Sequence, residues 1–532
     1  MAQVRMTSTR RDFLALMLGA PLAMACRGAA PRRIPPGTLV ETGMTRGHAL
    51  VRDRTPPVVS TWRRHRVAIV GGGVAGLAAA WELRRRGIRD VVVLELDDVV
   101  GGTARGGSSS VTGYPWGAHY IVAPQRDQHD LIALLRDMNA IEDVAADGTP
   151  IVDELLRCRE PEERVWYLGR WWEGLYLEAG ASVEDKRQLA AFTAEIDRWS
   201  GWRDEQGRRA FAIPRSRGSD AAEVRALDSI SFAAWLDARH LTSPRLRWLC
   251  DYACRDDYAL TAPQTSAWAG LFYFAARQSG PGAEPQSVVT WPDGNHALVD
   301  HLASGQTIER GVAVVDVDDV ADGARVTAIG KDGPFGIHAD AVIVATPTFV
   351  ANRIVRARRG QPAGDYGAWT VANVHLRARP AERGRGAPPA WDNVFRDSPS
   401  LGYVSATHQR GRDRGATVWT WYYPFSDDDA VAVREKLAGA GYHEWAEVIL
   451  ADLARAYPDV YEHVEHVEVA FWGHGMVRPR VGFAWSDALV GHARPIGHIH
   501  FAHTDLSGLA IFEEAFDHGL RAARAIAEGM PA

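Results

Sequence analysis

A glycine-rich segment has the residue types and spacing of a dinucleotide-binding turn. Gly71, Gly73 and Gly76 form the pattern G-x-G-x-x-G. The first glycine permits a tight turn, the second lets the backbone approach a pyrophosphate, and the third lets a helix pack closely on a strand. Glu95 follows after about 20 residues, where an acidic side chain accepts hydrogen bonds from a ribose. The pattern predicts a dinucleotide site but does not separate NAD from FAD.

Two strands and a helix must hold these residues in place. Arg66–Val70 is a short apolar strand that leads into the glycines, Leu77–Arg86 has helical composition, and Val91–Leu94 is a second strand. The helix N-terminus then faces the phosphates with its free N–H groups. A strand, turn, helix and strand within about 30 residues is a more specific signal than the glycines alone. We therefore expect a Rossmann-like unit.

Further motifs lie elsewhere in the chain. They are a second glycine pair in Leu96–Arg105, a Pro-x-Gly segment in Trp291–Val299, the strand Ala341–Val344 that runs into Ala-Thr-Pro, and the closing segment His500–Gly519. Together these motifs resemble the flavin-containing amine oxidase superfamily, which includes relatives of protoporphyrinogen oxidase and phytoene desaturase. The resemblance favours FAD over NAD as the dinucleotide.

The resemblance implies a set of cofactor-binding residues. In the family, the closing acidic residue contacts the ribityl–phosphate region, and a helix N-terminus points at the pyrimidine carbonyl. Arg105 is expected to offset the pyrophosphate charge, and the Val312 backbone to meet the adenine. No cysteine lies in the C-terminal flavin segment, so non-covalent FAD is expected. The residues implied are Gly71, Gly73, Val74, Ala75, Gly76, Glu95, Leu96, Gly101, Gly102, Thr103, Arg105, Gly117, Ala118, His119, Val312, Ala345, Thr346, Pro347, Asp505 and Glu513.

Four residues are candidates for the catalytic side. The resemblance places His119 and Tyr120 in a loop beside the isoalloxazine ring, where a histidine can take part in proton transfer. A histidine satisfied by backbone hydrogen bonds is an equal alternative. Trp421 lies on an alternating strand that suits the wall of a cleft, although core packing is its alternative interpretation. The position of Trp472 in the sequence predicts that it forms part of an aromatic cage.

The positions of the lysines bear on which oxidation reaction the resemblance implies. Many amine oxidases of the superfamily place a lysine near flavin N5, and none of Lys186, Lys331 and Lys436 matches that position. This absence weakens the assignment of an oxidase that reacts with O2, and leaves the electron acceptor open. We expect hydride transfer from a small organic substrate, first an amine or amino acid, to flavin N5. The alternatives are a desaturase or ring oxidase of an apolar substrate, and a non-catalytic exported FAD-binding protein.

The expected fold class is α/β, with a Rossmann-like FAD-binding domain and an inserted α+β substrate domain. Residues 64–125, 290–350 and 470–532 are expected to form the FAD-binding domain. Residues 126–289 and 351–469 interrupt it and are expected to form the substrate domain. Flavin oxidases of the resembled type build their substrate domain from such insertions.

The composition of the chain limits the kinds of binding partner that we expect. The chain has 532 residues, a net charge of −6 and 46% hydrophobic content, which indicates a globular protein with more than one core. No run of basic residues interleaves with aromatics, so nucleic acid is not an expected partner. Cys250 and Cys254 are interpreted as buried structural thiols, since no further ligands accompany them. His498, His500 and His503 lack a carboxylate cluster, and no metal site is predicted.

The N-terminus resembles a twin-arginine export signal. Arg10 and Arg11 precede the apolar run Leu14–Ala25, which is too short to span a bilayer. Residues 1–26 are therefore expected to be a signal read by the twin-arginine machinery, and 27–63 a linker. We expect a periplasmic or secreted protein with no transmembrane span, and a lipid anchor on Cys26 is a minority alternative.

Overall fold

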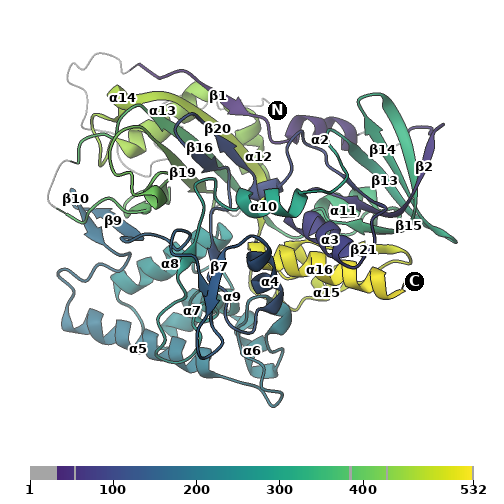
Figure 1. Ribbon diagram of the computed structural model, residues 1–532. Helices are drawn as coiled ribbons and strands as arrows, with labels where there is room; N and C mark the ends of the chain where they lie inside the picture. The colour runs from purple at the N-terminus through teal and green to yellow at the C-terminus, as the bar shows by residue number, and fades with distance from the viewer. Residues whose placement is uncertain (1–32, 53–55, 383–385, 427–428, 530–532) are drawn as a thin grey trace, which may run out of the picture.

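Two lobes stand side by side, each built around one large sheet (Figure 1). The computed structural model describes residues 33–52, 56–382, 386–426 and 429–529. The expected export signal, residues 1–26, and its Cys26 lie outside the described residues.

The first lobe contains the predicted dinucleotide unit at the centre of a seven-stranded sheet. Its strands are β12 (Ile308–Glu309), β3 (Val91–Leu94), β2 (Trp62–Val70), β15 (Gly333–Val344), β14 (Gly323–Gly330) and β13 (Ala313–Val320), with β21 (Ile499–Phe501) paired to β15. Strands β2, β3, β15 and β21 run parallel, while β13, β14 and β15 form an antiparallel meander. All four residues of β3 are buried, as expected for a parallel strand covered on both faces.

Helices surround this sheet, packed on its strands or on one another. They are α3 (Val74–Arg85), α10 (His296–Ala303), α11 (Thr348–Ile354), α15 (Asp487–His492) and α16 (Phe512–Gly529). The contact between α3 and α16 depends on a glycine, because a Cβ on Gly519 would stand 2.3 Å from the carbonyl oxygen of Ala75. This contact brings the middle of α16 against the first turns of α3, next to the predicted glycine turn.

The second lobe is built on an eight-stranded mixed sheet. In order, its strands are β1 (Gly37–Val40), β20 (Val464–Val477), β16 (Tyr366–Leu376), β19 (Thr417–Pro424), β18 (Gly402–Ser405), β17 (Asp392–Phe395), β9 (Glu163–Tyr167) and β10 (Arg170–Glu173). Both expected insertions contribute strands, and β16 is buried along its whole length. The mixed α/β class with a cofactor sheet and a substrate sheet is confirmed.

Helices cover both faces of the second sheet. On one face lie α12 (Ala430–Ala438), α13 (Tyr442–Leu453) and α14 (Val460–His463), and below the other lie α5 (Val183–Gly201), α6 (Ala222–Ala226), α7 (Phe232–Asp237), α8 (Pro244–Tyr258) and α9 (Ala267–Ala275) (Figure 1). Cys250 and Cys254 are fully buried on α8 in the core of this helical group, as predicted. Burial raises the pKa of both thiols.

Several short elements lie outside the two large sheets and the helices named above. They are α2 (Met44–Arg52), β4 (Gly106–Ser108), β5 (Gly113–Pro115), β6 (Ile121–Val122), α4 (His129–Asp137), β7 (Ile141–Val144), β8 (Pro150–Val152) and β11 (Val288–Val289). Strand β11 pairs with β6, so the end of the first insertion returns to the loop that follows the glycine pairs.

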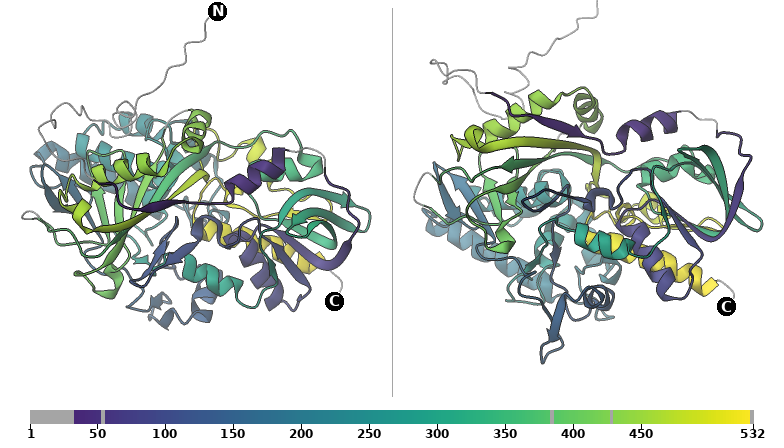
Figure 2. Two further views of the ribbon diagram at one scale, coloured as in Figure 1. Left: turned by 90° about the horizontal axis from the view of Figure 1, so that it is seen from above. Right: turned by 45° about the horizontal axis from the view of Figure 1, so that its top comes forward.

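Residues 33–52 differ from the linker expected there. Strand β1 adds in parallel to the edge of the substrate sheet, and Figure 2 shows it lying along β20. The carbonyl oxygen of Pro36 accepts from the N–H of Val467 at 3.1 Å, and that of Pro35 from the hydroxyl of Tyr442 at 2.9 Å. The open edge of β20 therefore gains a hydrogen-bonded partner, which composition alone does not indicate.

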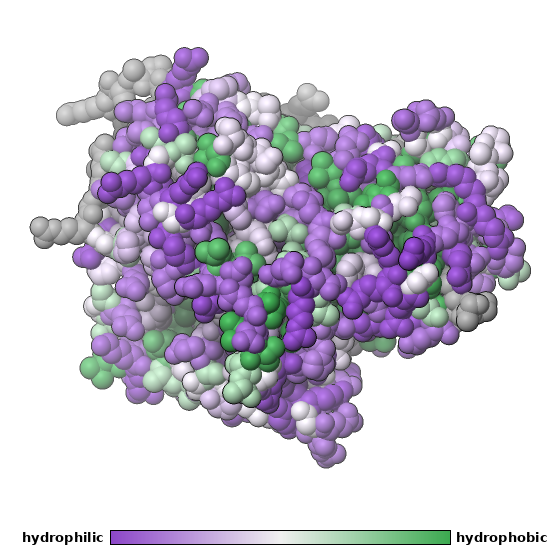
Figure 3. Space-filling model, viewed as in Figure 1, coloured by the Kyte–Doolittle hydropathy of each residue, from purple (hydrophilic) through white to green (hydrophobic). Residues whose placement is uncertain are grey.

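One side of the surface can be judged from its hydropathy colouring. The side shown in Figure 3 is mostly hydrophilic, and its hydrophobic residues lie in separate small patches. Within the described ranges, no helix is both long and apolar enough to cross a membrane.

Candidate active site

The predicted glycine turn lies between β2, β3 and α3. Gly71 takes a φ of +106°, and a Cβ there would stand 2.5 Å from the carbonyl oxygen of Ala345. A Cβ on Gly76 would stand 2.0 Å from the carbonyl oxygen of Gly71. Glycine is therefore required at both positions, one for the turn and one for the close approach of α3 to the sheet.

The space in front of Gly73 suits a pyrophosphate. Gly73 is the N-cap of α3, and nothing lies within 4 Å of a Cβ built on it. No side chain caps the helix and its first turn holds no acidic residue, so the N–H groups beginning at Val74 and Ala75 remain available. The second glycine pair stands opposite, since Gly73 bridges to Gly101 and the Cβ position of Gly102 lies 3.7 Å from the Gly73 Cα.

Glu95 ends β3 next to this space. Its carboxylate accepts from the backbone N–H of Gly72 at 2.7 Å and of Asp97 at 2.8 Å. Burial raises the pKa of Glu95, and the two backbone donors oppose that effect. Val312 is joined to the same residue, because its N–H donates to the carbonyl oxygen of Glu95 at 2.8 Å. The expected ribose acceptor and the expected adenine-side backbone therefore lie together.

Two predicted residues are engaged elsewhere. The guanidinium of Arg105 pairs with Asp97 at 2.6 Å and donates to the carbonyl oxygen of Glu41 at 3.0 Å. It is thus held by protein groups that sequence spacing does not reveal, and its expected role of offsetting the pyrophosphate charge has no support in these contacts. The carbonyl oxygen of Leu96 accepts from Arg46 of α2 at 2.6 Å, so the segment before β2 covers this loop.

Asp505 is also occupied by protein groups. Its carboxylate accepts from the hydroxyl of Tyr366 and from the N–H of Thr348 at 2.7 Å, and pairs with His503 at 3.0 Å. Thr346 and Pro347 precede Thr348, so Asp505 fixes the turn after β15. These contacts hold the Asp505 carboxylate at the turn after β15, and the direct flavin contact that the family resemblance implies stays a prediction.

A cavity of about 160 Å³ opens between the two lobes. Its cofactor side consists of Thr103, Gly117, Ala118, His119, Tyr120 and the N-terminus of α16 with Glu513. Its substrate side consists of side chains from α8, β16, β17, β19 and β20, including Tyr252, Asp256, Trp369, Asp392, Tyr422 and Trp472. The N-terminus of α16 thus faces the cavity, as expected for the helix near the flavin pyrimidine.

His119 is enclosed by aromatic rings. The ring centroids of Tyr120, Trp391 and Tyr422 lie 5.2, 5.3 and 4.9 Å from that of His119. Burial lowers the pKa of His119 to about 4, so the imidazole is neutral at pH 7. Its Nδ1 lies 3.2 Å from the carbonyl oxygen of Gly117 and must carry the proton, because a carbonyl only accepts. Nε2 is therefore left as a hydrogen-bond acceptor.

The two candidate tryptophans lie on opposite sides of the substrate sheet. Trp472 lines the cavity and donates from Nε1 to the carbonyl oxygen of Trp116 at 2.7 Å. Trp421 does not line it: the ring is fully buried in the core beneath α13 and donates to Asp452 at 2.9 Å. Placing Trp421 in the cleft is wrong by one residue, since neighbouring strand residues face opposite ways and Tyr422 is the one that faces the cavity.

A group of buried carboxylates is the feature that sequence reasoning missed. Asp256 and Asp257 end α8, and Asp392 begins β17; all three line the cavity. One cation, Arg277, faces them from the same wall and donates to both oxygens of Asp257 at 3.1 Å. The hydroxyl of Tyr252 donates to Asp392 at 3.3 Å. The adjacent Asp pair in the last turn of α8 is the sequence feature that could have indicated this group.

The pKa values reflect the crowding of these charges. Burial and the neighbouring Asp257 raise the pKa of Asp256 to about 7. Burial, Asp256 and Glu163 raise the pKa of Asp392. The wall thus holds more carboxyl groups than cationic groups, and a bound cation would lower the electrostatic cost of ionising them. None of the three lysines lines this cavity.

Comparison with known proteins gives the family. The family described as "Flavin containing amine oxidoreductase" matches residues 74–527, which make up most of the chain. The chain therefore belongs to the flavin-containing amine oxidoreductase family, and the family implies FAD as its cofactor.

Solved structures share this fold at low sequence identity. A double mutant of putrescine oxidase gives a TM-score of 0.62 at 21% identity, covering 87% of this chain and 99% of that one. Cyclohexylamine oxidase from Brevibacterium oxydans gives 0.60 at 17% identity, covering 87% and 99%. A fatty acid isomerase from P. acnes gives 0.60 at 16% identity, covering 87% and 98%. These structures establish the fold, and their substrates differ.

A curated relative shares one short segment. Flavin-containing monooxygenase FMO GS-OX-like 5 of Arabidopsis thaliana is 55% identical over 47 residues, which are 9% of this chain and 10% of that protein. The chain thus matches about a tenth of the length of the curated relatives.

Proposed function

We propose that this protein oxidises a small cationic amine, with non-covalently bound FAD as the hydride acceptor. The observation that carries the proposal is the acidic wall of the cavity, where Asp256, Asp257 and Asp392 face a single Arg277. A protonated amine supplies the missing positive charge. An anionic or wholly apolar substrate would leave at least one buried carboxylate unpaired, which is costly in a cavity of low polarity.

The residues on the cofactor side fit FAD. The open N-terminus of α3 at Gly73 and the facing Gly102 would hold the pyrophosphate, and Glu95 the adenosine ribose. Gly117 and Ala118 would lie along the isoalloxazine, with the N-terminus of α16 toward its pyrimidine end. No cysteine is among the residues that line the cavity, which supports non-covalent binding. Once bound, FAD supplies an acceptor for two electrons as hydride.

The chain's own residues would orient the substrate and take up its proton. Tyr422 and Trp472 form the apolar walls that keep water from the reacting carbon. His119 presents a neutral Nε2 toward the aromatic enclosure, and we assign it as the acceptor of the proton that the reacting nitrogen must lose. Asp256 and Asp392 would attract the protonated amine into the cavity before its nitrogen loses that proton.

The test is anaerobic reduction of the flavin by a matched panel of compounds. The purified protein should be yellow, and its flavin absorbance should bleach with a primary alkylamine or diamine. A carboxylic acid and a polyene of similar length should leave it oxidised. Bleaching by the polyene alone would favour the desaturase alternative, and a flavin that no compound reduces would favour a non-catalytic role.

We also propose that the protein is exported by the twin-arginine route to the periplasm or the exterior. Support comes from the paired arginines and the short apolar run within residues 1–26. Cell fractionation of the wild-type chain and of a variant with Arg10 and Arg11 both changed to Lys would test the proposal. Retention of the variant in the cytoplasm is the expected result, and equal export of both would refute it.

A further inference from the structure

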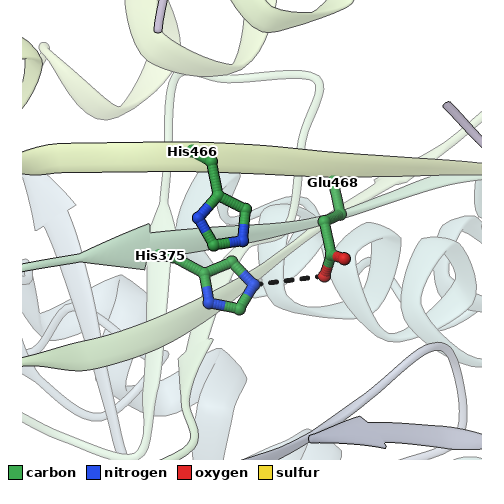
Figure 4. Close-up of side chains that lie close together, drawn as sticks. All are labelled: His375, His466 and Glu468. Carbon is green, nitrogen blue, oxygen red and sulfur yellow. Dashed lines mark hydrogen bonds and ion pairs between the residues drawn. The ribbon is translucent and has the colours of Figure 1, made fainter. Parts of the chain in front are cut away.

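Three side chains with metal-binding groups meet on the substrate sheet, away from the cavity. Figure 4 shows His375 of β16 beside His466 and Glu468 of β20. His375 and His466 are directly opposite in the antiparallel register, and Glu468 lies two residues farther along β20. Because alternate residues of a strand share a face, the register places all three side chains on one face of the sheet.

Their donor atoms are close to the spacing of a metal site. Nε2 of His375 lies 3.1 Å from Oε2 of Glu468, and one donor atom from each residue lies within 4.8 Å of the others. The two imidazole rings stack with centroids 3.9 Å apart. Zinc takes nitrogen and oxygen ligands at about 2.0–2.2 Å, so tetrahedral ligands stand about 3.4 Å apart. Side-chain shifts of about 1 Å would therefore suffice.

A neighbouring tyrosine contacts two members of this cluster. The hydroxyl of Tyr114 donates to Oε2 of Glu468 at 2.8 Å, and its ring meets that of His375 edge-on at 5.0 Å. Such an outer partner fixes the orientation of a ligand.

We propose that His375, His466 and Glu468 bind a zinc ion, with water as its fourth ligand. Two imidazoles and a carboxylate suit zinc better than Ca²⁺ or Mg²⁺, which prefer oxygen ligands throughout. The side chain of Glu468 is 24% exposed, which leaves an entry path for the ion and for the water.

The site is separate from the proposed amine oxidation. His375 lies six residues along β16 from Trp369 of the cavity wall, a distance of about 20 Å at the rise of a strand. The effect of the bound zinc on the cavity would be structural. Tyr114, which contacts the zinc ligands, is connected along the chain through Trp116 to the Gly117 loop of the cavity. Sequence reasoning predicted no metal site because 93 residues separate His375 from Glu468, and only the strand pairing joins them.

The experiment is zinc titration of the full protein after treatment with a chelator and dialysis. Competition with a chromophoric zinc indicator should show one tight site per chain in the wild type. His466→Ala should weaken that site at least 100-fold, and this half-exposed residue can be removed without opening the core. Tyr114→Phe should weaken it about 10- to 100-fold, the usual effect of losing an outer partner.

The matched control is His463→Ala, three residues earlier in the chain. His463 pairs with Asp459 at 3.5 Å and is not in the cluster, so this variant should bind zinc as the wild type does. Two results would overturn the proposal: a wild-type protein that binds no zinc above the level of His466→Ala, or equal losses in the His463 and His466 variants. Neither result depends on flavin content or on activity.

Discussion

At the scale of single residues, the environment of His119 decides what it can do. A buried imidazole with a pKa of about 4 is neutral at pH 7 before the reaction, whereas an exposed histidine is partly protonated near pH 6.5. The carbonyl of Gly117 fixes the proton on Nδ1. Only Nε2 is free to accept a proton. His119 can therefore act as a base in the reaction but not as an acid.

The substitution His119→Asn separates these two nitrogens. The amide N–H of asparagine can still donate to Gly117, but no acceptor replaces Nε2. We expect the rate of flavin reduction to fall at least about 100-fold, the usual contribution of a general base. Stopped-flow reduction by an amine at saturating concentration measures it. An unchanged rate would assign proton transfer to another group.

Asp256 should give amine binding a dependence on pH. With its pKa raised to about 7, the carboxyl is mostly neutral at pH 6 and mostly charged at pH 8. An alkylamine remains protonated throughout, since its pKa lies near that of lysine at about 10.4. Binding should therefore weaken as the pH falls from 8 to 6.

Asp256→Asn should remove this dependence, with weak binding at both pH values. Titration of the oxidised protein with a non-reducing quaternary amine analogue, at each pH, provides the measurement. A wild-type affinity that does not change between pH 6 and pH 8 would contradict the assignment.

The two tryptophans should respond to substitution in opposite ways. Trp421→Phe leaves buried Asp452 without one donor, and we expect a loss of about 1–3 kcal/mol in unfolding free energy with little change in kcat/KM. Trp472→Phe alters the cavity wall and should reduce kcat/KM for the amine with a smaller loss of stability. Denaturant unfolding and steady-state kinetics on both variants check this, and a fall in kcat/KM with Trp421→Phe alone would reverse the assignment.

At the scale of secondary-structure elements, the glycine turn gives the sharpest test of cofactor binding. A methyl group on Gly73 meets no protein atom within 4 Å, so Gly73→Ala should fold normally. The methyl group would stand where the pyrophosphate is proposed to lie, and FAD affinity should fall at least tenfold. Flavin absorbance per protein after dialysis measures this loss. Gly280→Ala, also in open space, is the control and should keep its flavin.

The outcome of sequence reasoning also differs by element. Local patterns located β2, β3 and the glycine turn because strand, turn and helix are adjacent in the chain. They did not locate the acidic wall, since Asp256 and Asp392 meet only through the packing of α8 on β17. The prediction for Trp421 failed because it depended on which face of the sheet the side chain occupies, and successive residues of a strand point to opposite faces. Strand β1 was missed because its partner β20 lies more than 400 residues away.

At the scale of the whole molecule, the cavity between the lobes carries an electrostatic cost that should appear in stability. The pKa of Asp256 is about 7 in the folded protein, against an ordinary value of 3.8. Between these values the folded state holds a proton that the unfolded state releases. Stability from this group is therefore largest at low pH and decreases as the pH rises toward 7, by about 1.4 kcal/mol per pH unit for each such proton.

A bound cation should reverse this loss. Since Asp256 is mostly charged at pH 8 and mostly neutral at pH 6, a non-reducing quaternary or tertiary amine analogue should raise Tm more at pH 8 than at pH 6. Thermal unfolding with and without the analogue, at both pH values, measures the difference. In Asp256→Asn the gain at pH 8 should shrink toward the gain at pH 6. A ligand effect of equal size at both pH values in the wild type would show that the acidic wall does not bind the amine, because charge on that wall is what distinguishes the two conditions.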